Sequence, residues 1–203
     1  MKIICIGRNY LDHIKEMNNE VPEYPVFFMK SENALYHKNL PFFIPDFSKN
    51  IHYELELVIK ICKTGKNIEE KFAHTYFDAV TVGLDLTARD LQKECIQNGE
   101  PWEKAKSFDF SAPLGEFIDL KDTPYPASIK FSLEKNGEIV QNGDSKNMVF
   151  DFRKIIAHVS KYNTLKTGDL IYTGTPAGVG QLNKGDKLIA RIESKELLSL
   201  DVK

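Results

Sequence analysis

Apolar and polar residues alternate over several short stretches of this chain, which is the pattern of β-strands that bury one face. The alternation predicts strands over residues 2–6, 26–29, 51–61, 79–86, 129–133, 169–173 and 187–192. Asn136-Gly137 is a typical hairpin turn and should return the chain to a partner strand near Ile139. Apolar residues three to four positions apart predict only short helices, over residues 10–17, 91–98 and 152–161.

The predicted strands outnumber the helices, and the two do not alternate as they do in strict βαβ units. We therefore expect a mainly β or α+β fold, a mixed β-sheet roll with a few short helices, in preference to a doubly wound sheet. The sequence has no internal repeat, and its Pro and Gly residues are spread along the chain instead of gathered in a linker. One continuous domain over residues 1–203 is predicted.

The amino-acid composition argues against several classes of protein function. Lys and Arg number 27 against 29 Asp and Glu, and the basic residues are scattered, which argues against binding to nucleic acid. Cys5, Cys62 and Cys95 are odd in number and far apart, so reduced thiols are expected in place of a zinc cluster. No apolar stretch is long enough for a signal peptide or a membrane span, and a cytoplasmic protein without a membrane partner is predicted.

Two acidic residues lie in the most regular of the predicted strands, 51–61. The alternation places Glu54 and Glu56 on the same side, about 7 Å apart along the strand. Taken alone, such a pair is explained better by the solvated face of an edge strand than by a site. Asp85 favours a site, because it ends a run that otherwise has the composition of a buried strand. Three carboxylates without a nearby Cys indicate Mg²⁺ or Mn²⁺, with open positions for water and substrate.

A helix is predicted directly after Asp85, so its N-terminus should lie beside the acidic residues. Thr87 and Asp90 have the spacing of a capping box at this helix. Arg89 and Gln92 share one helical face and could hold a carboxylate or carbonyl oxygen, although an exposed surface pair has the same spacing.

Two further segments could bind an anion. Lys106 lies among Trp102 and Phe108, which could partly desolvate its ammonium, but spacing alone does not distinguish it from the other lysines. Residues 168–180 are typical of a strand that opens into a Gly-rich loop containing Thr175, whose amides could cradle an anion. The loop lacks the Gly-Lys-Ser/Thr ending of a phosphate-binding loop, so nucleotide binding is not expected.

A possible acid–base pair lies near the N-terminus. Asn9 could cap a short helix, on which His13 and Glu16 then share one face. A carboxylate can orient an imidazole so that it takes a proton from water. A surface His/Glu pair has the same spacing, and both alternatives stay open at this point. The helix and the loop after it, residues 10–20, could move as a lid.

These segments together resemble the fumarylacetoacetate hydrolase family, in particular its short single-domain members that act as acylpyruvases and oxaloacetate decarboxylases. The matching segments are Gly7-Arg8-Asn9-Tyr10 with Asp12-His13, His52-Tyr53-Glu54-Leu55-Glu56-Leu57, Asp85-Leu86-Thr87-Ala88-Arg89-Asp90-Leu91-Gln92, Ala105-Lys106-Ser107-Phe108-Asp109 and Thr173-Gly174-Thr175-Pro176-Ala177-Gly178-Val179-Gly180. One departure is Tyr53, where relatives often carry a second His; it falls on the apolar face of its strand.

The resemblance implies a roll of the family's C-terminal-domain type, a homodimer, and one Mg²⁺ or Mn²⁺ ion on Glu54, Glu56 and Asp85. It also implies that His13 and Glu16 form a water-activating dyad on the lid, and that Lys106 is catalytic. The residues implied to hold substrate oxygens are Arg8, Lys30, Arg89, Gln92 and Thr175.

The expected substrate is a small 2-oxo acid. By resemblance, an acylpyruvate would be cleaved at its C–C bond by hydrolysis, through an enolate stabilised by the metal, and the same site would allow decarboxylation of oxaloacetate. Two alternatives remain: isomerase or hydratase action on 2-oxo dioic acids of aromatic catabolism, and a catalytically silent metal-binding homologue.

Overall fold

The computed structural model describes residues 1–36, 40–120 and 128–203. Its central element is a six-stranded mixed sheet in which β1 and β12 are parallel and the other neighbours are antiparallel. In spatial order the strands are β2 (Val26–Lys30), β1 (Ile3–Gly7), β12 (Leu170–Tyr172), β5 (Leu55–Ile61), β6 (Phe77–Leu84) and β9 (Ile118–Asp119).

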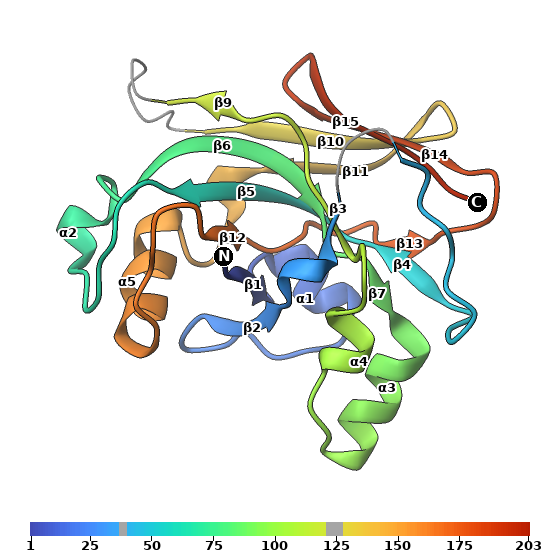
Figure 1. Ribbon diagram of the computed structural model, residues 1–203, viewed down its shortest axis with the longest axis horizontal. Coiled ribbons are helices and arrows are strands. Elements are labelled where there is room, and N and C mark those ends of the chain that lie inside the picture. Colours follow the sequence, from blue (N-terminus) through green and yellow to red (C-terminus); the bar gives the residue numbers. More distant parts are fainter. Residues whose placement is uncertain (37–39, 121–127) are drawn as a thin grey trace.

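A four-stranded antiparallel sheet lies across β5 and β6 (Figure 1). Its strands are β11 (Glu138–Asp144), β10 (Lys130–Lys135), β14 (Lys187–Ile192) and β15 (Lys195–Asp201). Buried aliphatic and aromatic side chains of both sheets, such as Leu57, Phe131 and Leu188, form the main hydrophobic core between them. Val58 points the other way, into a second core with Cys5 and Tyr172. Strand β5 is therefore buried on both faces.

Short strands and helices complete the fold. A three-stranded sheet holds β13 (Gly180–Gln181), β4 (Ile51–Tyr53) and β7 (Thr87–Ala88), while β3 (Leu35–Tyr36) pairs with β8 (Ala112–Pro113). The α-helices are α1 (Leu11–Glu16), α2 (Glu70–Ala73), α3 (Arg89–Asn98), α4 (Glu103–Lys106) and α5 (Phe152–Tyr162), with 3-10 turns η1 (Glu32–Ala34) and η2 (Ser145–Asn147).

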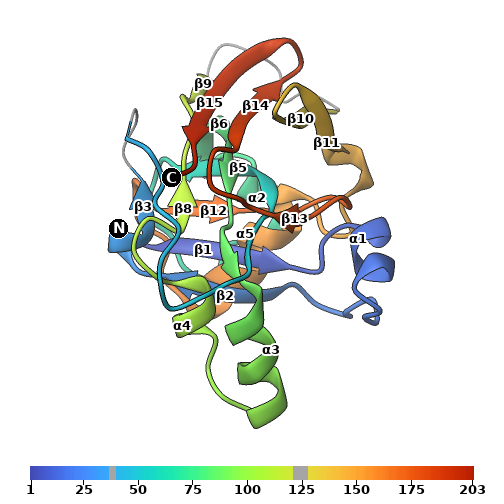
Figure 2. The same cartoon turned by 90° about the vertical axis from the view of Figure 1, so that its right-hand side faces the viewer.

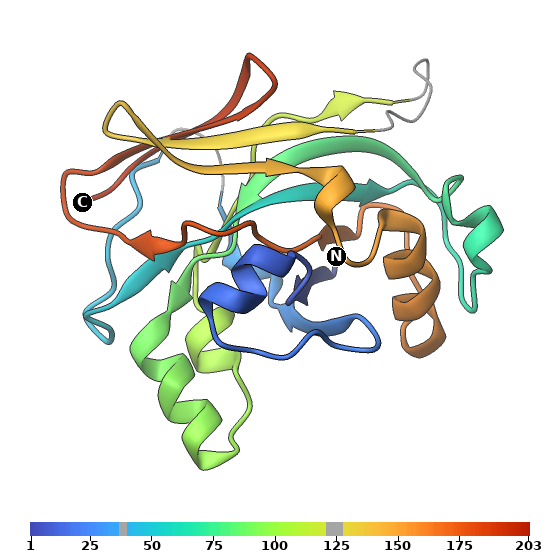
Figure 3. The same ribbon diagram turned by 180° about the vertical axis from the view of Figure 1, so that it is seen from behind.

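The helices surround the lower side of the sheets. Helices α3 and α4 project together below them (Figure 2), and the view from behind places α1 between this pair and α5 (Figure 3). Asp151 caps α5 by accepting a hydrogen bond from the amide of Lys154 at 2.9 Å. No helix in the described ranges is long and apolar enough to cross a membrane.

The structure confirms the predicted fold class of mixed sheets with few short helices. It also confirms the hairpin, because Asn136 and Gly137 adopt φ angles of 55° and 91° between β10 and β11. The strands β3, β7, β8, β9, β13 and β15 were not predicted; most are too short to show an alternation.

Two local predictions were wrong. Residues 51–61 do not form one strand, because the chain breaks at Glu54 between β4 and β5, and β5 lies between two neighbours instead of at an edge. The capping box at α3 is absent too: Ala88 is the N-cap residue and has no capping side chain. The carboxylate of Asp90 instead accepts hydrogen bonds from the Ser48 hydroxyl and the Lys49 amide.

Close packing at Gly83 leads to a stability prediction. A Cβ atom on this β6 residue would lie 2.6 Å from Cε1 of Tyr172, a ring that is fully buried. Gly83→Ala should therefore lower the free energy of unfolding by about 1–3 kcal/mol, measured by urea denaturation. Gly7→Ala is the matched control, because its nearest new neighbour is 4.0 Å away. Equal effects of the two substitutions would contradict the packing argument.

Candidate active site

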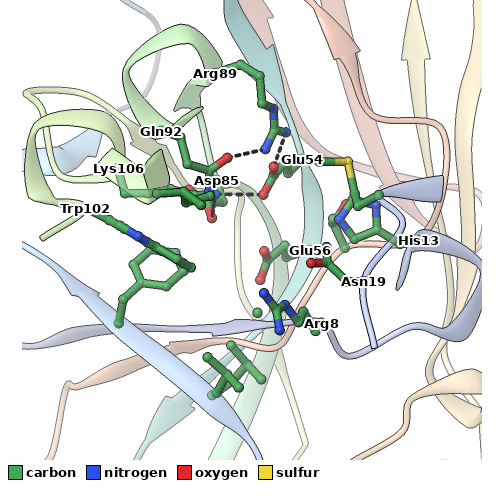
Figure 4. A pocket seen from close by; sticks show the side chains of 17 residues that line it. Arg8, His13, Asn19, Glu54, Glu56, Asp85, Arg89, Gln92, Trp102 and Lys106 are labelled. Atoms are coloured by element: carbon green, nitrogen blue, oxygen red, sulfur yellow. Dashed lines mark hydrogen bonds and ion pairs between the residues drawn. The ribbon is translucent and has the colours of Figure 1, made fainter. Parts of the chain in front are cut away.

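Three buried carboxylates lie close together at the point where β5 begins and the neighbouring strand β6 ends. Alternation along the chain points Glu54 and Glu56 to one side, and the pairing of Glu56 with Gly83 brings Asp85, just after β6, opposite Glu54. The Asp85 amide donates a hydrogen bond to the Glu54 carbonyl at 2.8 Å. One carboxylate oxygen from each of the three side chains lies within 4.8 Å of the others (Figure 4). The cluster predicted from the sequence is thus brought together.

Cations partly neutralise this cluster. The Lys106 ammonium, on α4, lies 2.9 Å from Glu54, 2.7 Å from Asp85 and 2.6 Å from the Thr87 hydroxyl. Arg89 at the start of α3 forms an ion pair with Glu54 and donates a hydrogen bond to the Gln92 amide oxygen at 2.6 Å. Helices α3 and α4 therefore position the cations that face the acidic residues.

Lys30 lies behind Asp85 and not on the pocket wall. Its fully buried ammonium is 2.8 Å from Asp85 and donates hydrogen bonds to the carbonyls of Leu86, Lys106 and Ser111. These acceptors belong to the segments that carry Asp85 and Lys106. The geometry favours a supporting role for Lys30 over the predicted contact with a substrate oxygen.

The ionisation of the cluster is uneven. Burial raises the pKa of Glu54, but the neighbouring ammonium of Lys106 and guanidinium of Arg89 outweigh it, so this pKa lies well below its ordinary value. Burial and the adjacent charge of Asp85 raise the pKa of Glu56 well above normal; a hydrogen bond from the Gly174 amide at 2.7 Å opposes them only in part. Glu56 makes no ion pair within the described part of the chain, whereas Glu54 pairs with Lys106 and Arg89, and Asp85 pairs with Lys30 and Lys106.

The cluster fits a hard divalent cation. All three donors are carboxylate oxygens, which Mg²⁺ and Mn²⁺ prefer, and no Cys or His sulfur or nitrogen is among them. A divalent ion among these ligands would favour the ionised form of Glu56, whose pKa is raised by burial and by the adjacent Asp85. Glu54, Glu56 and Asp85 are therefore the residues that could hold the metal.

Helix α1 brings a second functional pair to the same pocket. Nδ1 of His13 lies 2.9 Å from Glu16, which leaves Nε2 as the nitrogen available for proton transfer. The other oxygen of Glu16 accepts a hydrogen bond from the Gly178 amide at 3.1 Å. This contact links α1 to the Gly-rich loop after β12. Figure 4 shows His13 across the pocket from Lys106.

Asn9 anchors the start of α1 but does not cap it, so the predicted N-cap was wrong. The N-cap residue is Tyr10, without a capping side chain. The buried Asn9 amide donates hydrogen bonds to the carbonyls of Phe150 and Thr173 at 3.0 and 2.7 Å, and its oxygen accepts one from the Phe150 amide at 2.8 Å. A Cβ on Gly174 would lie 2.6 Å from Cβ of Asn9, so the two segments are in close contact.

One wall of the pocket is apolar. Phe28 and Trp102 face each other with ring centroids 6.0 Å apart, and Lys106 lies 5.2 Å from the Phe28 centroid. Phe28 thus takes the desolvating role that the sequence had assigned to Phe108, which lies beside Lys30. The free volume of the pocket is about 100 Å³, which suits a small substrate. The remaining lining residues are Ile6, Gly7, Arg8, His13, Met17, Asn19, Val26, Glu54, Glu56, Asp85, Arg89, Gln92, Ile96 and Thr175.

Gln141 is a supporting residue that the sequence did not indicate. Its buried amide accepts a hydrogen bond from the Leu55 amide at 2.8 Å and donates one to the Thr175 hydroxyl at 2.9 Å. It thereby connects β11 of the upper sheet to the strand of the carboxylates and to the Gly-rich loop. A polar residue in a strand was its only signal, and such residues are common on exposed faces.

Comparisons with known proteins show the family of this chain. The family model described as fumarylacetoacetate (FAA) hydrolase C-terminal matches residues 2–201. The chain belongs to the fumarylacetoacetate hydrolase family. An oxaloacetate tautomerase of Escherichia coli is 42% identical over 97% of this chain and 90% of its own. The predicted resemblance and roll are thereby confirmed.

Two solved structures of the family extend the comparison. A fumarylpyruvate hydrolase of Pseudomonas aeruginosa in complex with Mn²⁺ and pyruvate has a TM-score of 0.94 at 35% identity, and the match covers 100% of this chain and 89% of that one. A 5-carboxymethyl-2-hydroxymuconate delta-isomerase of Mycobacterium smegmatis has a TM-score of 0.86 at 33% identity, over 99% and 77% of the chains.

Metal binding should release a proton. The raised pKa of Glu56 keeps its carboxyl protonated to a higher pH than usual, whereas a metal ligand must be ionised. Calorimetric titration of Mn²⁺ in buffers of different ionisation enthalpy should detect release of on the order of one proton below this pKa, with affinity rising as pH rises through it. Glu56→Gln should remove the release. Proton-independent binding in the wild type would contradict the assignment.

Proposed function

We propose that this chain is a divalent-metal-dependent enzyme that cleaves the C–C bond of acylpyruvate-type 2-oxo acids by hydrolysis. The observation that carries the proposal is that the buried carboxylates of Glu54, Glu56 and Asp85 line one small pocket together with His13, whose ring is held by Glu16. Such a hydrolysis needs two features: a binding site for a hard divalent cation and an oriented imidazole that can act as a general base.

When bound, the Mg²⁺ or Mn²⁺ ion would act as a Lewis acid toward the 2-oxo acid and stabilise negative charge on its oxygens. The chain itself supplies further donors. Lys106 and Arg89 carry positive charge on one side of the pocket, and the Gln92 amide and Thr175 hydroxyl lie on its wall. We assign these residues the binding and orientation of the substrate's oxygens.

His13 has the geometry of a general base. Glu16 holds Nδ1, so Nε2 can take a proton from water while the oxygen of that water attacks the distal carbonyl carbon. The C–C bond then breaks, its electron pair passes to the pyruvate fragment as an enolate, and the acyl fragment leaves as a carboxylic acid. The proton on His13 can return to the enolate carbon and give pyruvate, which balances the reaction.

Oxaloacetate tautomerisation is the second candidate, favoured by the names of relatives such as the Escherichia coli tautomerase. The same pair could move a proton between C3 and the keto oxygen without any attacking water. Decarboxylation of oxaloacetate would use the same stabilised enolate. The isomerase of Mycobacterium smegmatis supports a related reaction on larger dioic acids.

The proposal extends to a mobile lid, the domain organisation, the oligomeric state and the compartment of the enzyme. Helix α1 with the following loop, residues 10–20, would act as a lid, because the Glu16–Gly178 hydrogen bond can join or release it. We also propose that residues 1–203 form one catalytic domain, that two copies form a homodimer, and that the enzyme works in the cytoplasm.

A substrate panel tests the reaction class. Acetylpyruvate, fumarylpyruvate and oxaloacetate should be assayed with Mg²⁺ or Mn²⁺, following C–C cleavage, keto–enol exchange and CO₂ release separately. We expect hydrolysis of at least one acylpyruvate, with loss of activity on chelation. Tautomerisation without cleavage would favour the second candidate, and no turnover of any substrate would indicate a silent homologue.

His13→Ala separates the proposed steps. It should lower acylpyruvate hydrolysis by about 100-fold or more, because general base catalysis contributes that much, while metal-assisted decarboxylation of oxaloacetate should fall far less. Lys15→Ala is the matched control on the same helix, since its side chain is 78% exposed. Hydrolysis near the wild-type rate in His13→Ala would show that the dyad has another role.

A further inference from the structure

Strand β11 buries an amide and exposes an aliphatic side chain. Gln141 is 1% exposed, whereas Ile139, two residues earlier, is 57% exposed. The partner of Leu133 in β10 is Gln141, but the partner of the next β10 residue is Ile139, so Val140 is the extra residue of a β-bulge. The bulge turns Gln141 inward and leaves Ile139 in solvent. Fold stability alone would favour the opposite arrangement, because burying an aliphatic side chain is favourable and burying an amide is costly.

The partners of Gln141 fix the orientation of its amide. The Leu55 N–H, 2.8 Å away, can only donate, so the Gln141 atom that faces it must be the oxygen Oε1. The Pro176 carbonyl, 2.9 Å away, can only accept, so the atom that faces it must be the nitrogen Nε2. The second hydrogen of Nε2 is then donated to the Thr175 hydroxyl oxygen at 2.9 Å.

This orientation decides how the hydroxyl of Thr175 can be used. Its oxygen accepts a hydrogen bond from Gln141, so its own hydrogen must be donated elsewhere. The Pro176 carbonyl is 3.4 Å away, which is long for a bond from a hydroxyl, and it already accepts from Gln141 at 2.9 Å. Thr175 lines the pocket. The hydroxyl hydrogen is therefore available to an acceptor that enters the pocket.

The bulge also supports the loop that carries Thr175. Gly178 has a φ angle of 98°, and a Cβ atom on it would lie 2.3 Å from the carbonyl oxygen of Val140. The loop therefore lies directly against the bulge of β11. On its other side, Gln141 is bonded to the amide of Leu55, the residue between the carboxylates of Glu54 and Glu56. Gln141 thus fixes Thr175 relative to the strand of the acidic cluster.

We infer that Gln141 is a positioning residue that presets the Thr175 hydroxyl as a hydrogen-bond donor to the bound 2-oxo acid. The inference rests on the proposed function for the class of ligand. The carboxylate and keto oxygens of such a ligand can only accept hydrogen bonds, so a hydroxyl that offered its lone pairs to them would repel them. An amide whose nitrogen faces the hydroxyl prevents that orientation, and a side chain that only accepts would enforce it.

The test measures binding of pyruvate, a product of the proposed reaction, to the Mg²⁺-loaded protein by calorimetric titration. Thr175→Val removes the donor and should lower the affinity by about 10-fold, as for one hydrogen bond to an anion. Gln141→Glu keeps an acceptor for the Leu55 amide. Its ionised carboxylate would accept from the Thr175 hydroxyl and draw the hydrogen away from the ligand, so the loss should be of similar size.

The pH dependence and a double-mutant cycle separate this role from a merely structural one. In Gln141→Glu, the introduced carboxyl can donate to Thr175 when protonated and can only accept when ionised. The affinity relative to wild type should therefore fall as pH rises from 5 to 9. In the Thr175→Val background, Gln141→Glu should change the affinity little further. Gln97→Glu, at an exposed position of α3 outside the pocket lining, is the matched control and should keep a constant ratio.

The outcomes also separate this inference from the proposed function. It is overturned if Thr175→Val leaves pyruvate binding unchanged, if the loss in Gln141→Glu is the same at every pH or without the hydroxyl, or if the metal-loaded wild type binds no pyruvate. Should Gln141→Glu not fold, Gln141→Met, which has a similar shape and no charge, carries the same cycle. If the two positions are coupled but the wild type turns over no 2-oxo acid, the positioning role stands and the proposed reaction is wrong.

Discussion

Repulsion among three buried carboxylates is the constraint on which this site depends. Glu54, Glu56 and Asp85 are each at most 5% exposed, and burying an isolated charge costs several kcal/mol even after relaxation. Lys106 and Lys30 offset part of this cost by direct ion pairs. Glu56 makes no ion pair among the described residues and its pKa is raised, so a divalent cation bound here would relieve the remaining repulsion.

The fold meets that constraint by placing Glu56 on its most enclosed strand and Glu54 directly before that strand. Strand β5 has a hydrogen-bonded neighbour on each side and a hydrophobic core on each face, so Glu54 and Glu56 cannot turn toward solvent. Gln141 ties the upper sheet to the same strand, and Asn9 ties the N-terminal segment to the loops around Phe150 and Thr173. The pocket is therefore rigid at its base, and α1 with His13 is attached to its rim through Glu16.

Local sequence patterns predicted the carboxylates of the site better than the residues that hold the surrounding segments in place. Alternation placed Glu54 and Glu56 together, and an acidic residue at the end of an apolar run identified Asp85, because both signals depend on neighbours in the chain. Asn9 was misassigned because its partners lie 141 and 164 positions away. The contacts of Lys30 with Leu86, Lys106 and Ser111 were not foreseen for the same reason, because these acceptors belong to distant segments. The break at Glu54 was missed for the same reason: it follows from pairing of β4 with β7 and β13, which no short window contains.

The parallel pairing of β1 with β12 also affects how the protein is made. Ile3–Cys5 align with Leu170–Tyr172, so β1 completes its pairing only after a segment far along the chain has been synthesised. Until then β1 can pair with β2 alone, and its other edge of amides and carbonyls stays open to wrong partners. Contacts of such long sequence separation slow folding. The central sheet, and with it the base of the pocket, can therefore close only after β12 has been synthesised.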